Sequence, residues 1–268
     1  MLFRSQAILA EYGLGVSELC AMSKRGEKIA CLTAYDASFA QVLDQAGVDI
    51  ILVGDSLGMV IQGHDSTVSV SMEDMIYHSA CVSSISKRAL VLVDMPFMSY
   101  SNIDQALFNA TRLMQEGGAQ MVKLEATERQ SEIVAEMSAC GIPVCAHLGL
   151  RPQYIHKLGG YQRQGQDSES AEQILQDAIS LEKAGADLLL VECITHTLAA
   201  KIQQTVSIPV IGIGAGKDCD GQILVLQDIL GITPGKTPSF AKNYLTKGGI
   251  QTAVQDYVAE VKSGDFPN

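Results

Sequence analysis

The chain has 268 residues, a length that suits one domain of barrel size or two smaller domains. Hydrophobic residues make up 47% of it and charged residues only 18%, and the formal net charge is −11. Soluble domains usually carry about 25% charged residues, so this shortage predicts that part of the surface is buried against other subunits. The negative charge argues against phosphate-rich partners, and we expect neither nucleic acid nor a membrane surface as a ligand.

The cysteines and the apolar runs indicate the compartment. Seven cysteines are an odd number, and no two of them form a CxxC pair. We interpret them as reduced, mostly buried thiols rather than as a disulfide framework. No apolar run approaches the roughly 18 residues that a membrane span requires. Residues 2–10 also lack the pattern of a secretory signal. We therefore expect a cytoplasmic protein.

In chain order, the first predicted element is a helix over Val16–Lys24, with Ser17 as its cap. The run 50–54 has no polar alternation, which is typical of a strand buried on both faces of a parallel sheet. Similar runs recur, separated by helical patterns. Thr127 and Ser170, each followed by Gln three residues later, have the spacing of a capping box at a helix start. The predicted strands are 29–34, 50–54, 89–94, 120–125, 142–147, 187–192, 208–213 and, with a weaker signal, 222–226.

The joints between helices and strands also repeat. Asp36 would cap a helix over Ala37–Ala46, which Gly47 ends. Ala-Gly-Val-Asp at 46–49 then leads into a strand, and Ala-Gly-Ala-Asp at 184–187 does the same. Repeated βα units predict a parallel sheet. Eight strands in about 250 residues fit a single (β/α)₈ TIM barrel domain over 1–268. A doubly wound open sheet is the alternative, but the first turn lacks its glycines.

Two long loops follow predicted strands, over residues 55–75 and 148–169. Both lie on the carboxyl side of the sheet, and loops of this length inside a compact domain are commonly functional. The second has the glycines and polar residues of a mobile lid. After residue 230 we expect a Pro/Gly turn and then C-terminal helices near 239–246 and 249–262.

Ionisable residues are scarce in this chain, yet almost every predicted strand ends in one. Such ends converge on one mouth of a barrel, and burying an unpaired charge there costs several kcal/mol. Carboxylates crowded together suppress one another's ionisation unless a cation intervenes, and an oxygen-rich site suits Mg²⁺. The pattern therefore indicates an acidic metal site for a small anionic substrate. Its candidate residues are Asp55 with Ser56, Asp94, Lys123 with Glu125, His147 and Glu192.

Each candidate also has a structural interpretation. A lone Asp at a strand end is commonly a helix cap, and Lys123 would serve equally well as a partner of Glu125. His147 would be a satisfied core histidine, and Glu192 would cap the next helix. The glycines at 212–216 would form a tight turn, because their spacing does not match the dinucleotide fingerprint. The placement of all these groups at one end of consecutive strands favours the site. The other four histidines are interpreted as loop or surface residues.

With these residues assembled, the sequence resembles the ketopantoate hydroxymethyltransferase family over about residues 28–232. The most specific matching segments are VGDSLGM (53–59), QGHDST (62–67) and DMPFMSY (94–100). Further matches lie at 122–125, 146–150, 158–161, 211–216 and 219–222.

The resemblance implies transfer of a hydroxymethyl group from 5,10-methylenetetrahydrofolate to 3-methyl-2-oxobutanoate through a Mg²⁺-stabilised enolate. The product would be 2-dehydropantoate, for pantothenate and coenzyme A synthesis. It also implies a TIM barrel and a large homo-oligomer, commonly a decamer. Asp55, Asp94 and Glu125 would be metal-site residues. The keto acid would contact Asp55 and Asp94, and Ser56 and Lys123 would bind its carboxylate end. Glu192 would be the base, with His147 assisting it or orienting the substrate.

Two other classes remain open. The first is another Mg²⁺ enolate enzyme of the phosphoenolpyruvate mutase and isocitrate lyase group. Those enzymes often use a cysteine in a mobile loop, and neither long loop here contains one. The second is a barrel that serves only as an oligomeric scaffold, which would have no reason to place acids at so many strand ends.

Overall fold

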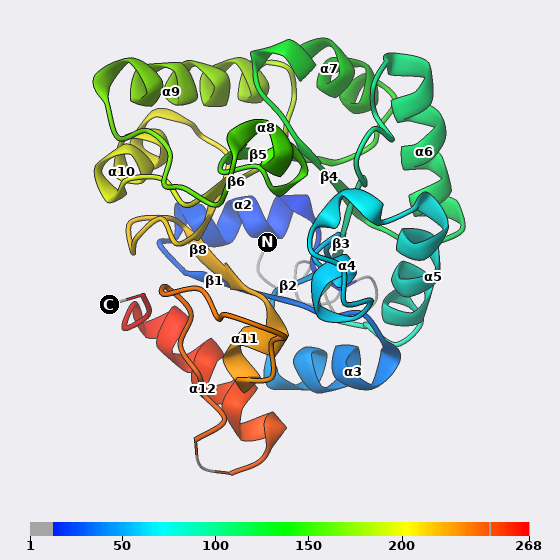
Figure 1. The fold of residues 1–268 in the computed structure, drawn as a ribbon, viewed down its shortest axis with the longest axis vertical. Coiled ribbons are helices and arrows are strands. Elements are labelled where there is room, and N and C mark those ends of the chain that lie inside the picture. The colour runs from blue at the N-terminus through cyan, green and yellow to red at the C-terminus, as the bar shows by residue number, and fades with distance from the viewer. Residues whose placement is uncertain (1–12, 247, 268) are drawn as a thin grey trace.

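The computed structural model describes residues 13–246 and 248–267, and it is a barrel of eight parallel strands surrounded by helices (Figure 1). Neighbouring strands pair in sequence order, and β8 pairs with β1, which closes the barrel. This closure confirms the predicted (β/α)₈ fold and excludes the open sheet. The strands are β1 (Ile29–Thr33), β2 (Ile50–Val53), β3 (Leu90–Asp94), β4 (Met121–Glu125), β5 (Val144–Gly149), β6 (Leu188–Glu192), β7 (Val210–Ile213) and β8 (Gly221–Leu224).

The helices fill the connections between the strands and flank the barrel. They are α2 (Val16–Lys24), α3 (Ala37–Ala46), α4 (Leu57–Val60), α5 (Met72–Ser83), α6 (Ile103–Gln115), α7 (Ser131–Ala139), α8 (Ile155–Leu158), α9 (Ser168–Lys183), α10 (His196–Thr205), α11 (Leu226–Leu230) and α12 (Ile250–Ser263). Short 3₁₀ turns are η1 (Thr67–Ser69), η2 (Glu128–Gln130) and η3 (Pro152–Tyr154).

All eight predicted strands exist, with ends within two residues of the prediction. The largest consequence is at β5, which continues to Gly149, so His147 lies inside the strand rather than at its end. The helix over Ala37–Ala46 is confirmed, with Asp36 accepting hydrogen bonds from two backbone amides and Gly47 at φ 88°. The two long loops are interrupted by short helical turns.

Two of the three predicted N-caps outside α3 are wrong. Ser17 lies inside α2, whose N-cap is Gly15 without a side-chain bond. Ser170 lies inside α9, because Asp167 already accepts hydrogen bonds from the amides of Glu169 and Ser170. The capping box that begins at Thr127 is confirmed.

The C-terminal segment holds one predicted helix and lacks the other. The helix near 249–262 is α12, whereas 239–246 has no helix. Contacts with the barrel explain this difference. Phe240 packs so closely on Gly214 that a Cβ on that glycine would lie 2.7 Å from the ring. Tyr244 is buried, and its backbone amide donates to Ile229 O at 2.7 Å. These tertiary contacts outweigh the local helical preference.

The described residues contain no helix that is both long enough and apolar enough to cross a membrane. All seven cysteines are free, as expected. Only Cys31, Cys145 and Cys219 are fully buried, and Cys140 is exposed, so the expectation of mostly buried thiols is wrong. Residues 2–10, where no secretory signal is expected, lie outside the described residues.

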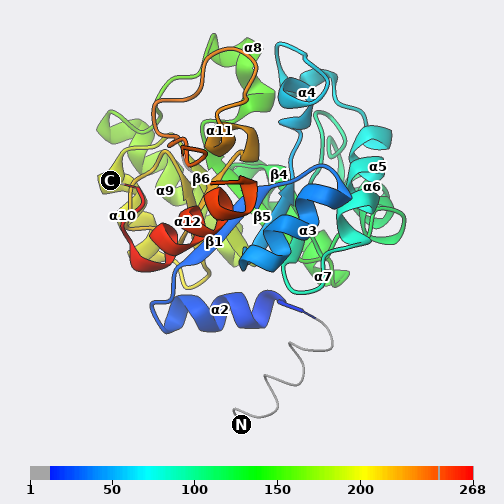
Figure 2. The ribbon, with the colours of Figure 1, turned by 90° about the horizontal axis from the view of Figure 1, so that it is seen from below.

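The inside of the barrel is an apolar core that α2 closes at one end. The inward-facing side chains of the strands, among them Ile29, Leu92 and Cys145, pack with Leu19 and Met22 of α2. Figure 2 shows α2 beneath the barrel, and α4, α8 and the segment between α11 and α12 at the opposite end. Because the floor is sealed by side chains, a ligand enters from the carboxyl ends of the strands.

The repeated joints have a physical function at the amino ends of the strands. The Asp49 carboxylate accepts a hydrogen bond from Ala30 N at 2.9 Å, and the Asp187 carboxylate accepts one from Val144 N at 2.9 Å. Gln120 and Asp220 accept from Val91 N and Val210 N, the first or second residues of β3 and β7. In each case the residue before an even-numbered strand satisfies an amide at the start of the preceding strand. A buried amide left without such a partner would be costly.

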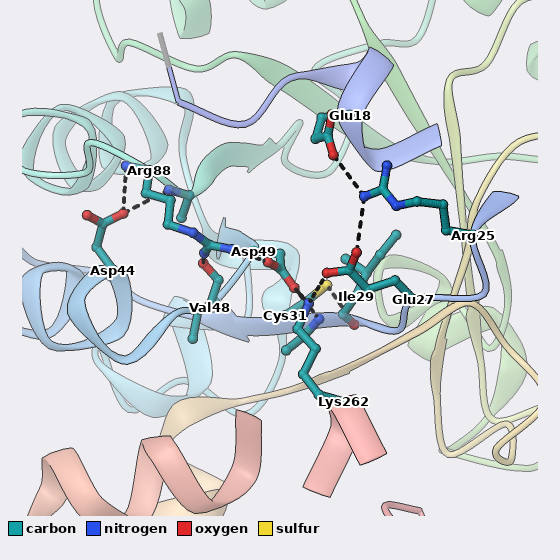
Figure 3. Close-up of polar contacts among 12 residues, drawn as sticks. Glu18, Arg25, Glu27, Ile29, Cys31, Asp44, Val48, Asp49, Arg88 and Lys262 are labelled. Atoms are coloured by element: carbon teal, nitrogen blue, oxygen red, sulfur yellow. Dashed lines mark hydrogen bonds and ion pairs between the residues drawn. The ribbon is translucent and has the colours of Figure 1, made fainter. Parts of the chain in front are cut away.

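Asp49 also anchors the C-terminal helix to the barrel (Figure 3). Its buried carboxylate lies 2.6 Å from Arg88 Nη2 and 2.6 Å from Lys262 Nζ of α12. Lys262 and Arg25 both contact Glu27, which continues the network toward α2. One fully paired carboxylate therefore holds β1, β3 and α12 together.

We predict that Asp49→Ala lowers the free energy of unfolding by about 3 kcal/mol, because it removes a buried acceptor from two cations and one amide. Chemical denaturation at neutral pH measures this. Glu27→Gln, at the exposed rim of the same network, is the matched control and should change stability much less. Equal effects of the two substitutions would contradict the anchoring role.

Candidate active site

The carboxyl end of the barrel opens into a cavity of about 610 Å³. The structure brings all the predicted site residues to it from five consecutive strands, β2 to β6. Their individual roles stay predictions. The predicted residues that line the cavity are Asp55, Ser56, Asp94, Lys123, Glu125, His147 and Glu192.

Four of these side chains form a chain of contacts across β3 to β6. Lys123 Nζ lies 2.7 Å from Asp94 Oδ1 and 3.3 Å from His147 Nδ1. His147 Nε2 then lies 3.2 Å from Glu192 Oε2. Strand register produces this order, since Asp94 pairs with Lys123 and the β5 and β6 ends lie side by side. With Lys123 donating to Nδ1, the imidazole hydrogen is assigned to Nε2, the nitrogen that faces Glu192.

The pKa shifts of His147, Lys123 and Glu192 favour a neutral imidazole and a basic carboxylate in this row of contacts. Burial, followed by the nearby Lys123 charge, lowers the pKa of His147 well below its usual value. Burial acts to lower the pKa of Lys123, but the carboxylates of Asp94 and Asp55 outweigh it and the pKa is raised. Burial raises the pKa of Glu192 to about 7, with Lys123 opposing and Asp94 reinforcing the rise. A carboxylate with such a pKa exchanges protons readily near neutral pH.

Asp55 and Ser56 occupy the turn that follows β2. The Asp55 amide donates to Asp94 Oδ2 at 2.9 Å, which draws the two carboxylates together. Gly54 makes this possible, because a Cβ there would lie 2.8 Å from Ser56 Oγ and 3.4 Å from Asp94 Oδ2. Ser56 Oγ lies 2.9 Å from the hydroxyl of the buried Tyr35. Behind them His78, expected at the surface, is half-buried, with Nδ1 2.6 Å from Tyr35 O.

The acidic residues fit a divalent cation that takes only a few of its ligands from the protein. No three acidic, histidine or cysteine side chains within 13–246 and 248–267 form a ready-made metal cage. Asp55 and Asp94 are nevertheless adjacent, and the buried Glu125 Oε2 has no hydrogen-bond partner among the described residues. Mg²⁺ is commonly held by one or two carboxylates, with water and substrate completing its shell. The donor set therefore suits Mg²⁺ completed by a chelating substrate.

Comparison with known proteins decides the family. The model of the ketopantoate hydroxymethyltransferase family matches residues 14–268. The chain belongs to this family. A 3-methyl-2-oxobutanoate hydroxymethyltransferase from Alkalilimnicola ehrlichii is 59% identical over 94% of this chain and 92% of that protein. One from Nitrosococcus oceani is 56% identical over 95% of this chain and 97% of that protein.

Solved structures agree with the fold at much lower identity. A phosphonopyruvate hydrolase in complex with oxalate and Mg²⁺ superposes with a TM-score of 0.60 and 13% identity. The match covers 79% of this chain and 81% of that chain. At this identity the likeness supports only the barrel.

Gln153 is a site residue that was not predicted from the sequence. It lies in η3, is buried, and its amide Nε2 donates to Asp55 Oδ2 at 2.8 Å and to Met95 O at 2.9 Å. Its backbone amide donates to Glu125 Oε1 at 2.9 Å. Gln153 thus fixes two acids of the mouth. Nothing in the sequence marks this uncharged residue within a long loop.

Cys193 is a further residue of this family member that sequence reasoning did not select. It follows Glu192, lines the cavity, and has a φ of 48°, which is uncommon for a residue with a side chain. Burial raises the pKa of its thiol to about 12. The thiol is therefore protonated at neutral pH and unsuited to act as a nucleophile.

Asp55 makes the stability of the metal-free protein depend on pH. Burial, and next the Asp94 charge, raise its pKa from 3.8 to about 8. The unfolded chain releases this proton near its ordinary pKa, whereas the folded chain retains it to about pH 8. The stability that this group contributes is therefore complete below about pH 4 and is lost as the pH rises to about 8.

We predict that in the presence of a chelator the free energy of unfolding falls more steeply from about pH 5 to about pH 8 for the wild type than for Asp55→Asn. Urea titrations across this range measure both slopes. The exposed Asp104→Asn serves as the control and should keep the wild-type slope. Equal slopes of unfolding free energy against pH for wild type and Asp55→Asn would refute the raised pKa of Asp55.

Proposed function

We propose that this chain is a 3-methyl-2-oxobutanoate hydroxymethyltransferase that uses 5,10-methylenetetrahydrofolate as donor and yields 2-dehydropantoate for pantothenate synthesis. The membership in the family and the names of its relatives support this activity. The observation that carries the mechanism is Glu192, a half-buried carboxylate with a pKa raised to about 7 at the wall of an acidic cavity.

Three residues would bind and orient the keto acid. The Lys123 ammonium has three donors, and Asp94 and His147 account for two of them. The third would meet the substrate carboxylate, with Ser56 Oγ as a second donor. Glu192 would then remove the proton from C3, next to the ketone. The neutral His147, whose Nε2 lies 3.2 Å from Glu192 Oε2, would help to hold that carboxylate toward the substrate.

The metal-site residues would be Asp55 and Asp94, with Glu125 acting through water or as a third donor. Mg²⁺ bound there would act as a Lewis acid toward the ketone and carboxylate oxygens of the substrate. Gln153 would keep Asp55 and Glu125 turned toward the cavity through the hydrogen bonds described above. Asp94 would serve both the ion and Lys123, because its Oδ1 lies next to the ammonium and its Oδ2 next to the Asp55 amide.

The carbon–carbon bond would form between C3 of the deprotonated keto acid and the methylene carbon of the folate. The two bonds from that carbon to folate nitrogens break, water supplies the hydroxyl group, and tetrahydrofolate leaves. The cavity is much larger than the small keto acid, which leaves room for a second substrate beside it. The 148–169 loop, which contributes Tyr161 and Arg163 to the lining, would cover the pair as a lid.

The alternative of a mutase or lyase has less support. Among the described residues, the only cysteine in the cavity lining is Cys193, which lies outside both long loops and is held protonated. A phosphonopyruvate hydrolase and a putative lyase/mutase share the barrel at 13% and 17% identity. The relatives named above are far more similar and carry the hydroxymethyltransferase name.

We further propose that the protein is cytoplasmic, that residues 1–268 form a single barrel domain, and that the protein is a homo-oligomer, with a decamer as the expected size. Low charge content and exposed aromatic side chains such as Tyr77 and Phe108 support an assembly. A monomeric mass in sedimentation velocity would disprove the homo-oligomer.

The direct test combines the protein with 3-methyl-2-oxobutanoate and 5,10-methylenetetrahydrofolate, with and without Mg²⁺. We predict 2-dehydropantoate only when the metal is present, because the acidic site needs a counter-charge to accept the anionic substrate. Chromatographic detection of the product measures it. No product under either condition would disprove the proposed activity.

For the base, we predict that Glu192→Gln lowers kcat by a factor of about 10² to 10⁴, since an amide cannot take up the proton. In the wild type kcat should rise with pH through about pH 7, as Glu192 loses its proton, and the variant should lose this dependence. Glu169→Gln, at an exposed position of α9, is the control. A variant that keeps the wild-type rate and pH profile would exclude Glu192 as the base.

For the metal, we predict that Asp94→Asn raises the Kd for Mg²⁺ at least about tenfold, because the amide keeps the shape but loses the charge. Isothermal titration with Mg²⁺ in the presence of the keto acid measures this, with the exposed Asp104→Asn as control. Unchanged Mg²⁺ affinity would remove Asp94 from the metal site.

A further inference from the structure

One wall of the cavity plays no part in the chemistry described so far. It consists of the end of β8, α11 and the C-terminal segment that follows. In the closed strand order β8 lies opposite β4, which carries Lys123 and Glu125. The segment after α11 stays on this wall because Phe240 packs against Gly214, whose φ of 59° and missing Cβ allow the contact. This wall therefore faces the acidic cluster across the mouth.

Among the described residues that line the cavity, Asp228 is the one carboxylate to which the mechanism gives no role. It lies in α11, only 4% exposed, and lines the cavity. Thr233 Oγ1 donates to its Oδ1 at 2.5 Å, and in residues 13–246 and 248–267 no side chain or amide donates to Oδ2. Burial raises the pKa of this carboxyl, against the opposing hydrogen bond from Thr233. A buried acceptor with a free oxygen beside a cavity indicates a ligand that supplies donors.

The proposed co-substrate carries such donors. The pterin ring of a reduced folate presents N3–H and a 2-amino group side by side on one edge, and a carboxylate can accept from both at once. The wall around Asp228 is otherwise largely apolar, with Ile213, Pro234 and Phe240 in the lining, which suits the faces of a flat ring. A ring anchored there by its 2-amino edge would turn the opposite side, where N5 holds the methylene carbon, toward the middle of the mouth.

We propose that Asp228 recognises the pterin ring of the folate by accepting hydrogen bonds from N3–H and the 2-amino group. This inference rests on the proposed function, since it names how that function's second substrate is held. It assigns the two substrates to opposite walls: the keto acid to the β2–β6 side and the pterin to the β8–α11 side. The 148–169 loop is then a cover for both rather than the main folate contact.

The test compares steady-state kinetics of the wild type, Asp228→Asn and Asp218→Asn, where Asp218 is an exposed residue of the β7–β8 turn. We expect Asp228→Asn to raise KM for 5,10-methylenetetrahydrofolate about tenfold or more, because one of the two accepting oxygens is replaced by an NH2 group that only donates. KM for 3-methyl-2-oxobutanoate should stay within about twofold of the wild type. A purely structural role would move both KM values, or only the melting temperature.

A ligand-side measurement keeps the inference testable if Asp228→Asn folds poorly. The affinity of the wild type is measured for tetrahydrofolate and for its analogue that lacks the 2-amino group. We expect the analogue to bind the wild type at least about tenfold more weakly, and Asp228→Asn, where it folds, to discriminate little between the two. Equal binding of both ligands to the wild type, or an unchanged folate KM in the variant, would overturn the assignment. Absence of any transfer by the wild type would instead refute the proposed function.

Discussion

A buried ammonium group holds the mouth of this barrel together. Lys123 lies among the carboxylates of Asp55, Asp94, Glu125 and Glu192, which would repel one another in a site with little water. Its direct contact with Asp94 places the positive charge at one end of the cluster. Glu192 is separated from that charge by a neutral imidazole, and its pKa stays raised to about 7. One cation thus divides a set of similar acids into those that would hold a metal ion and one that would move a proton.

The two ends of the barrel use the same residue type for opposite purposes. At the amino end, Asp49 is buried and fully paired with two cations and an amide, and it ties the terminal helix to the strands. At the carboxyl end, Glu125 and Asp228 are also buried but keep an oxygen without a partner among the described residues. Carboxylates whose oxygens have partners stabilise the fold, whereas a carboxylate with an unpaired oxygen is available to a ligand. Carboxylate oxygens without partners at the mouth destabilise the fold. The apolar floor and the paired backbone amides at the amino ends of the strands stabilise it.

Much of this was predictable from the sequence, because strong local patterns determine it. Apolar runs predicted the strands, most weakly at β8, and the glycine-containing joints predicted the repeated unit. Once the barrel is known, the strand order brings Asp94, Lys123, His147 and Glu192 together without further information.

The rest depends on contacts between distant segments. Residues 239–246 have helical composition, but Phe240 and Tyr244 are held by β7 and α11, and the chain stays irregular. Gln153 is neutral and lies inside a loop, so only its distances to Asp55 and Glu125 reveal it. Asp228 resembles an ordinary residue in the first turn of a helix until the structure shows that it lines the cavity.

In the proposed reaction, the acidic mouth would form an enolate from a keto acid, with Glu192 as the base. Exchange of the C3 proton of 3-methyl-2-oxobutanoate with deuterium from solvent, followed by NMR in the presence of Mg²⁺, reports this step alone. We expect exchange with the wild type and its loss in Glu192→Gln, while the variant still binds Mg²⁺ and the keto acid. Undiminished exchange in Glu192→Gln would rule out Glu192 as the base.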